Sequence, residues 1–558
     1  MTDSNTWPAL LADTAQNWHG LLLDTPAAQA LTGSYALWKD TVAASAPHLP
    51  MDSVPEDFGA VLAQSAVHQP IRFAASNAAA RLPATDDPLQ ADLTQIAAML
   101  RDRAISARDL TQLSLARLHA VHDRTNACVA IDDDAAHAQA ARCDAALAKG
   151  LTLGPLHGVP LAHKDLFYRE GVEVGCGMRV REARHYAWPG TAPVLASLEA
   201  AGSVNLARLH MTEWAFDPSG LNEELGTCRN PWDLDLVPGG SSSGSAVVVA
   251  ARAVYAALGT DTGGSVRIPA ALNGITGLKP TRGVVDVRGS MPLSHSNDTI
   301  GPLARSAADC ALMMQVIAQG GAVPPAILQS MQQGFAEVAR GGVADLKGLR
   351  IGVPERFFRE GVDARVAAPL EESLMLLKEL GALLKPVPDH DWRALNTAGA
   401  MLTRVEATAR LAKLSTFGDV RPALLARFQE GLAIPGSVYV QILNERAARL
   451  RQFLDTVMAD IDLLHVPVCR VVTPTIASVE AGGATAAAAR MELTVLNRPF
   501  NYLGVPSLAL PCGFAVGEGG SKLPVGFQLV GRPYADHHLL AIGAAWQSRT
   551  AWHREAPK

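Results

Sequence analysis

The segment Pro238–Pro280, PGGSSSGSAVVVAARAVYAALGTDTGGSVRIPAALNGITGLKP, is the stretch around which the chain is organised. It contains two Gly-Gly-Ser turns, at 239–241 and 263–265, on either side of an apolar segment rich in Ala and Val. That apolar segment predicts a buried helix, or a helix followed by a strand. Glycine-rich turns before helices let a ligand approach backbone N–H groups closely. A flexible Gly/Ser linker has a similar composition, but a linker would not be embedded in such apolar sequence.

The composition is that of a globular protein without a strongly charged partner. Of 558 residues, 48% are hydrophobic and 18% charged, and the net charge is 48 − 54 = −6 without a basic run. The seven cysteines form no CxxC pair, which predicts reduced thiols and neither a zinc site nor a disulfide framework. The N-terminus lacks the pattern of a signal peptide. We therefore expect a cytoplasmic protein that binds neither nucleic acid nor a membrane.

Two regions are expected along the chain. Residues 1–85 carry Trp7, Trp18 and Trp38 among weakly helical, Ala-rich patterns with several prolines. They predict an N-terminal helical extension that either packs on the rest of the chain or forms a dimer contact. A homodimer is therefore one of the expected alternatives. No linker pattern follows residue 90, and residues 86–558 are predicted to form one catalytic domain.

Helical and strand-like patterns alternate through the second region, which predicts an α/β fold. The expected helices cover 93–100, 106–118 (with 106–109 as a start that resembles a capping box), 134–149, 191–201, 363–380, 397–415, 437–459 and 536–548. The expected strands cover 159–162, 204–206, 349–353, 383–387, 461–468, 505–510 and 525–530.

A serine nucleophile needs a base, and the residues alone leave two candidates. Gly240–Gly244 formally matches the G-x-S-x-G pattern of a histidine-based triad centred on Ser242, but a loop precedes it where that pattern needs a strand. The other candidate is Lys164, at the end of the 159–162 strand. Its pKa would have to fall by about three units, roughly 4 kcal/mol, which burial could supply. Taken alone, Lys164 could equally be a surface cation or pair with Asp165.

A set of motifs decides between these bases by resemblance. The motifs are His157-Gly158-Val159-Pro160, Lys164-Asp165, Asn230-Pro231-Trp232, PGGSSSGS, GTDTGGSVRIPA, GLKPT, Asn501-Tyr502-Leu503-Gly504-Val505-Pro506-Ser507 and LPVGFQLVG. In order and spacing, over about residues 90–555, they resemble the amidase signature family. The resemblance implies the amidase-signature fold, a large mixed and twisted β-sheet covered by helices on both faces.

The resemblance also implies roles for individual residues. Ser265 matches the nucleophile, Ser241 the bridging serine that follows a cis peptide bond, and Lys164 the base that starts the proton relay. The backbone N–H groups that match the oxyanion hole belong to Thr262, Gly263, Gly264 and Ser265. An acyl-enzyme would form and be hydrolysed by water, and no metal or organic cofactor is implied.

Five neighbouring residues are expected to support this site. Gly240 would relieve crowding at the cis bond, and Asp261 and Arg267 would brace the nucleophile turn as an ion pair rather than touch substrate. His163 could tune the site or simply pack in the core. Ser242 could join the relay or cap the following helix.

Four more residues carry open alternatives. Trp214, Ala215 and Phe216 match a loop that borders the acyl pocket in this family, and they are candidate substrate-binding residues, although such aromatic residues could equally be core. Cys176 could be a nucleophile, but a lone cysteine is more commonly a buried thiol that packs in the core.

The resemblance implies an amidohydrolase that cleaves a carboxylic amide C–N bond in a small-molecule substrate, with a small or aryl acyl group expected. Alternatives are the glutaminase-type subunit of a tRNA-dependent amidotransferase, a carbamate or urea-derivative hydrolase, and a catalytically silent binding protein on the same fold. The N-terminal region and the lack of a basic patch favour a free-standing hydrolase over the amidotransferase subunit. The sequence does not identify the substrate.

Overall fold

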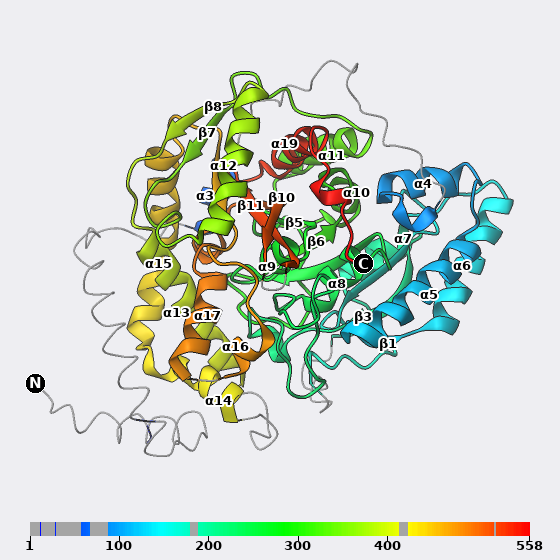
Figure 1. The fold of residues 1–558 in the computed structure, drawn as a ribbon, viewed down its shortest axis with the longest axis horizontal. Helices are drawn as coiled ribbons and strands as arrows, with labels where there is room; N and C mark the ends of the chain where they lie inside the picture. Colours follow the sequence, from blue (N-terminus) through cyan, green and yellow to red (C-terminus); the bar gives the residue numbers. More distant parts are fainter. Residues whose placement is uncertain are drawn as a thin grey trace, which may run out of the picture.

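A mixed eleven-stranded sheet runs through the molecule in the computed structural model (Figure 1), which describes residues 57–66, 87–178, 188–411, 422–481, 483–517 and 520–558, with Ala12 and Ala28. The strands are β1 (Cys128–Ile131), β2 (Pro160–Lys164), β3 (Val204–Leu209), β4 (Ala256–Asp261), β5 (Thr276–Lys279), β6 (Thr299–Ala304), β7 (Arg350–Val353), β8 (Leu383–Pro386), β9 (Leu463–Pro467), β10 (Ser507–Val516) and β11 (Lys522–Val530). Their order in the sheet is β1-β3-β2-β4-β6-β5-β10-β11-β9-β7-β8.

Strand direction changes across this sheet. β3, β2 and β4 are parallel neighbours, as are β9, β7 and β8, whereas the strands between β4 and β9 pair antiparallel. Parallel pairs need crossover connections, and helices supply them. The prediction of a large mixed sheet in an α/β fold is confirmed.

The α-helices cover both faces of the sheet. They are α3 (Phe58–Gln64), α4 (Leu93–Arg101), α5 (Ala107–Thr125), α6 (Asp133–Ala148), α7 (Pro193–Ala200), α8 (Ser243–Ala250), α9 (Arg267–Asn273), α10 (Ala307–Ile317), α11 (Pro325–Ala339), α12 (Ala364–Glu379), α13 (Trp392–Leu411), α14 (Pro422–Gln429), α15 (Gly436–Gln452), α16 (Ile476–Glu480), α17 (Gly483–Thr494), α18 (Arg498–Tyr502) and α19 (Asp536–Gln547). Gly543 of α19 packs on Leu508 and Leu510 of β10. Ser507, on the opposite face of β10, bonds Gln528, which accepts from Arg267 of α9.

The apolar part of the Pro238–Pro280 segment folds as a helix followed by a strand, as predicted. These are α8 and β4, and every residue of both is buried. The two glycine-rich turns precede α8 and α9. Each turn therefore leads into a helix that is held rigidly in the core.

The described part of the predicted extension is short. In α3, the Phe58 ring lies 4.1 Å from the Arg446 guanidinium and also contacts Gly504, so this helix packs on the main body of the protein. Apart from Ala12 and Ala28, the rest of the predicted 1–85 extension, including Trp7, Trp18 and Trp38, lies outside the described residues.

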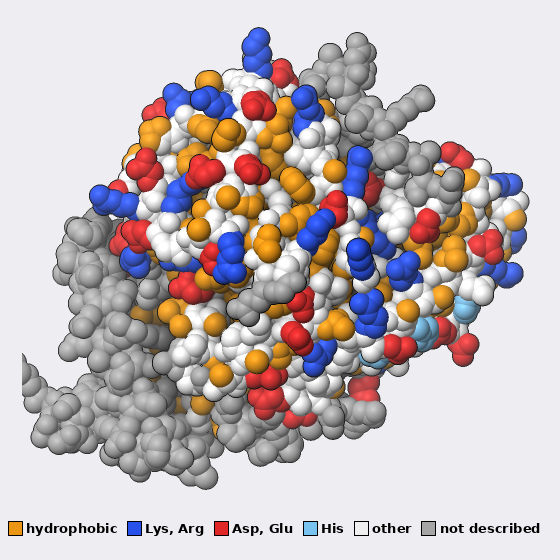
Figure 2. All heavy atoms as spheres, in the orientation of Figure 1, with side chains coloured by type: hydrophobic (Ala, Val, Ile, Leu, Met, Phe, Trp, Pro, Cys, Tyr) orange, Lys and Arg blue, Asp and Glu red, His pale blue; other side chains and the backbone are white. Residues whose placement is uncertain are grey.

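Three further observations bear on the expected environment of the protein. None of the helices in the described ranges is long and apolar enough to cross a membrane. Figure 2 shows basic and acidic side chains interspersed over one face. All seven cysteines are buried and unpaired.

Candidate active site

Lys164 is the last residue of β2, and its side chain meets both glycine-rich segments. Its Nζ lies 2.7 Å from Ser241 Oγ, in the turn before α8, and 2.9 Å from Thr260 Oγ1 in β4. β2 and β4 are parallel neighbours in the sheet, which brings the lysine beside a strand 96 residues further along the chain. Asp165 pairs with Arg208 instead of with Lys164. The lysine is 1% exposed, so it is neither a surface cation nor a partner of Asp165.

Burial controls the charge of Lys164. It lowers the pKa of the amine to about 7, while the nearby carboxylates of Asp298 and Asp261 act in the opposite direction. A large share of the amine is therefore neutral near pH 7. A neutral amine can accept the proton of a serine hydroxyl, which an ammonium cannot.

This pKa predicts the pH dependence of turnover. Because a base must be unprotonated, kcat/KM should rise with pH through an apparent pKa near 7 and fall about tenfold per pH unit well below it. The check is kcat/KM from pH 5.5 to 9, with circular dichroism to show that the protein is folded throughout. A flat profile between pH 5.5 and 8.5 would rule out Lys164 as the base.

The backbone around Ser241 is tightly enclosed. The Gly240–Ser241 peptide bond is cis. A Cβ on Gly240 would lie 2.6 Å from the Asp217 carbonyl oxygen, so only glycine fits there. The Ser242 side chain forms no helix cap and instead bonds the backbone N–H and carbonyl of Thr260 at 3.3 Å.

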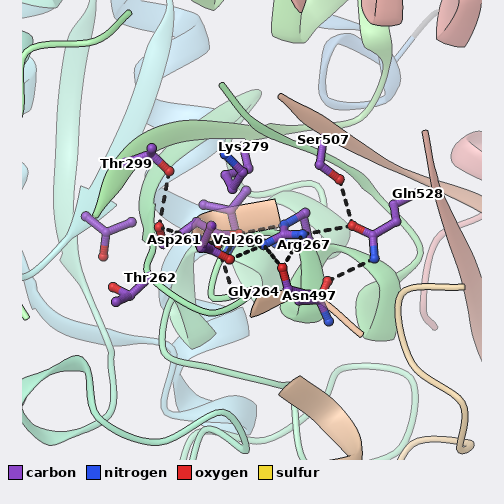
Figure 3. Close-up of polar contacts among 12 residues, drawn as sticks. Asp261, Thr262, Gly264, Val266, Arg267, Lys279, Thr299, Asn497, Ser507 and Gln528 are labelled. Atoms are coloured by element: carbon purple, nitrogen blue, oxygen red, sulfur yellow. Dashed lines mark hydrogen bonds and ion pairs between the residues drawn. The ribbon is translucent and has the colours of Figure 1, made fainter. Parts of the chain in front are cut away.

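The second turn is closed by the carboxylate of Asp261, the last residue of β4 (Figure 3). Asp261 accepts hydrogen bonds from the backbone N–H groups of Gly264, Val266 and Arg267, at 2.8, 3.2 and 3.4 Å. Gly264 has a φ of 120°, which L side chains rarely adopt. Ser265 lies within this turn and is half-buried.

Arg267 completes the closure as the expected ion pair with Asp261. Its guanidinium lies 2.9 Å from Asp261 Oδ1 and also donates to Gln528, Asn501 and the Asn497 carbonyl. Both charged side chains of the pair are fully buried. Burial alone would raise the pKa of Asp261, but Arg267 outweighs it and holds the pKa of this carboxyl well below its usual range.

This buried pair makes a stability prediction. Asp261→Ala would leave the Arg267 cation buried without its counter-charge, at a cost on the order of 3–5 kcal/mol. Asp389→Ala is the matched control, because Asp389 pairs with Arg356 on the surface. Thermal unfolding should show a clearly larger loss for Asp261→Ala, and equal losses would contradict a bracing role.

The hydrogen bonds to Asp261 limit which backbone N–H groups of the turn remain available to bind an oxyanion. The Gly264 N–H, expected among the oxyanion donors, already donates to Asp261. Among the described residues, none accepts from the N–H groups of Gly263 and Ser265. The Thr262 hydroxyl donates to Asp298 at 2.5 Å, and burial raises the pKa of Asp298 to about 6.

The remaining expected residues lie around this centre in different roles. His163 accepts from the Leu258 N–H inside the sheet, and burial lowers its pKa to about 3, so it packs as a neutral side chain. Cys176 is buried, and burial raises its pKa far above the usual range. Trp214 and Ala215 are buried in the short 3₁₀-helix η5 (Glu213–Ala215), whereas Phe216 is half-buried.

Phe216 contacts two residues from a distant helix, α14. Its ring lies 5.1 Å from that of Phe428 and 4.8 Å from the Arg427 guanidinium. The 214–216 segment thus reaches a helix more than 200 residues further along the chain.

Three polar residues of the site escaped the sequence analysis. Thr260 accepts a hydrogen bond from Lys164, and Asp298 accepts one from Thr262. Asn501 donates to Asp261 at 2.8 Å. Thr260 is the second residue of the recognised GTDTGGSVRIPA motif, and Asn501 opens another recognised motif, so both carried a local signal. Asp298 sits in a loop without any pattern. In the described ranges, no three His, Cys, Asp or Glu side chains are grouped as metal ligands.

Comparisons with known proteins agree with this fold. The family model described as Amidase matches residues 109–540. The chain is 34% identical over 497 residues to a glutamyl-tRNA(Gln) amidotransferase subunit of Pseudomonas syringae pv. tomato, covering 84% of this chain and 99% of that protein.

Two solved structures are similar as well. A crystal structure of an amidase is 32% identical with a TM-score of 0.71, covering 82% of this chain and 100% of the other. The peptide amidase from Stenotrophomonas maltophilia is 28% identical with a TM-score of 0.66, covering 84% and 97%.

Fold and comparisons together define an enzyme of the amide-cleaving class. The chain belongs to the amidase signature family.

Proposed function

We propose that this enzyme hydrolyses a carboxylic amide through an acyl-enzyme, with Ser265 as nucleophile, Ser241 as proton relay and Lys164 as base. The observation that supports the proposal is the buried 2.7 Å contact between Lys164 Nζ and Ser241 Oγ, made by an amine whose pKa is about 7. Residues 86–558 act as one catalytic domain, a proposal supported by a single sheet whose strands span residues 128–530.

The proposed reaction has two steps, formation of the acyl-enzyme and its hydrolysis. Ser265 Oγ bonds to the carbonyl carbon while its proton passes to Ser241 and the Ser241 proton passes to Lys164. The N–H groups of Thr262, Gly263 and Ser265 bind the developing oxyanion. When the C–N bond breaks, the proton returns to the leaving amine. Water then attacks the ester, and the acid leaves with Ser265 restored.

A second candidate function is the glutaminase-type subunit of a tRNA-dependent amidotransferase. The curated relatives support this alternative better than the free-standing hydrolase that the sequence analysis favoured, because the match to the Pseudomonas protein extends over 99% of its length. The chemistry at the serines would be the same, with glutamine as the amide and ammonia passed to a partner. The carbamate or urea-derivative alternative stays a prediction.

An assay of the purified chain separates the two candidates. Simple aliphatic and aryl amides and glutamine are offered to the chain alone, and release of ammonia or aniline is measured. Hydrolysis of simple amides by the chain alone supports the free-standing hydrolase. Activity confined to glutamine, or dependent on added amidotransferase partner proteins, supports the second candidate. No turnover under any of these conditions contradicts both.

A further inference from the structure

Arg498, the first residue of α18, lies against the turn that carries Ser265. A Cβ built on Gly263 would lie 3.2 Å from Arg498 Cγ and 3.5 Å from Arg498 Nε. Asn497 packs on Gly264 in the same way, because a Cβ built on Gly264 would lie 2.9 Å from Asn497 Cβ. The arginine side chain therefore runs along the turn proposed to hold the nucleophile and its oxyanion donors.

Arg498 has few partners compared with the buried arginines near it. Arg446 donates to the carbonyl oxygens of Tyr502, Ser296 and Asn501 at 2.6–3.0 Å, and Arg267 is similarly saturated. The Arg498 guanidinium makes one long hydrogen bond, 3.4 Å to Asn396 Oδ1. Within the described ranges, no carboxylate lies at ion-pair distance from it. Arg498 is half-buried, and none of its nitrogens is a buried atom without a partner, so its remaining N–H groups are open to solvent and can bind a ligand.

Among the described residues, the charged groups nearest Arg498 are two cations and one carboxylate, Glu430, which favours its charge but is not at ion-pair distance from it. Arg404 and Arg427 lie close enough to disfavour its charge, but they form their own ion pairs with Glu430 and Asp217. Burial, followed by these two cations, lowers the pKa of Arg498 to about 9. Arg498 is therefore charged at pH 7, and an incoming anion would relieve the repulsion.

The accessible surface at this turn is shared by three residues. Gly263, Ser265 and Arg498 are half-buried, whereas Gly264, Val266, Asn497 and Pro499 are buried. A molecule that reaches Ser265 from solvent therefore approaches a surface to which Arg498 also contributes.

We propose that Arg498 binds a carboxylate of the substrate, so that the enzyme acts on amides that also carry a free carboxylate group. The proposal rests on the amide hydrolysis proposed above. Arginine suits this task because its planar guanidinium can bind both carboxylate oxygens at once. Its place beside the Gly263–Ser265 turn requires the carboxylate to lie a few bonds from the scissile carbonyl.

The test compares pairs of amides that differ only in charge. Succinamate is paired with 4-methylpentanamide for a carboxylate in the acyl part, and N-acetylglycine with N-isobutylacetamide for one in the amine part. For wild type, kcat/KM should favour the anion of at least one pair by about 30-fold or more, through KM. The pair that shows the preference tells which part of the substrate carries the carboxylate.

Variants connect that preference to Arg498. Arg498→Met should reduce the ratio of the two kcat/KM values to within a few-fold, and Arg498→Lys should retain part of it. Arg490→Met is the matched control, because Arg490 already pairs with Asp217 and its loss should leave the ratio unchanged.

The outcomes separate this inference from the proposed function. Hydrolysis of neutral amides as efficient as that of their anionic partners overturns the carboxylate site and leaves amide hydrolysis standing. An anion preference that survives in Arg498→Met also overturns it. Failure to hydrolyse any amide, glutamine included, overturns the proposed function itself.

Discussion

Ser265→Ala is expected to abolish amide hydrolysis, with kcat falling on the order of 10⁶-fold, as for other serine nucleophiles. Without Oγ no acyl-enzyme can form, and neither Ser241 nor Lys164 has a hydroxyl on the turn to deprotonate. The turn itself should survive, since Asp261 and backbone N–H groups hold it closed. Ammonia release at saturating substrate measures the loss, and hydroxylamine trapping of the acyl group reports the missing intermediate.

A nearby serine serves as the control for this substitution. Ser243 is buried in the first turn of α8, and its hydroxyl has no hydrogen-bond partner. Ser243→Ala should keep kcat within a few-fold of wild type. Full turnover by Ser265→Ala, or hydroxamate formation by that variant, would refute the assignment of the nucleophile.

Lys164→Met is expected to lower kcat/KM by about 10⁴-fold without lowering the unfolding temperature. The relay loses its base, while the apolar side chain fills a similar volume in a buried site. Folding also no longer has to bury an amine, whose charged form the site disfavours on the order of 4 kcal/mol. Thermal unfolding alongside kinetics separates this result from simple destabilisation.

Lys279 offers a matched control for the base. It is equally buried, burial lowers its pKa to about 7 as well, and its Nζ donates to the Pro280 carbonyl oxygen rather than to a catalytic serine. Lys279→Met should cost less than tenfold in kcat/KM. If the two substitutions reduce activity equally, a buried lysine near the site, and not a base at Ser241, would explain the loss.

Many elements with a clear period were predicted correctly, because one half-buried face leaves a regular apolar pattern, although the amphipathic α11 was not predicted. The amphipathic α12 and the apolar β9 are examples. α10 was missed because nearly all of its residues are buried, which erases the period. β5 and β6 were missed because a glycine, a proline and a buried lysine interrupt their apolar runs.

The sequence by itself determined the α/β class, the positions of the two Gly-Gly-Ser turns and the candidates Lys164, Ser241 and Ser265. The order and spacing of neighbouring residues are sufficient to predict these features, because a turn or a motif is defined by residues that are close in sequence. Only the tertiary structure decided that Lys164 meets Ser241 and Thr260, that Asp261 takes the Gly264 N–H, and that Arg498 lies on the nucleophile turn. Sheet order and helix packing create these contacts across as many as 235 residues, 498 − 263, a separation at which the sequence holds no local pattern.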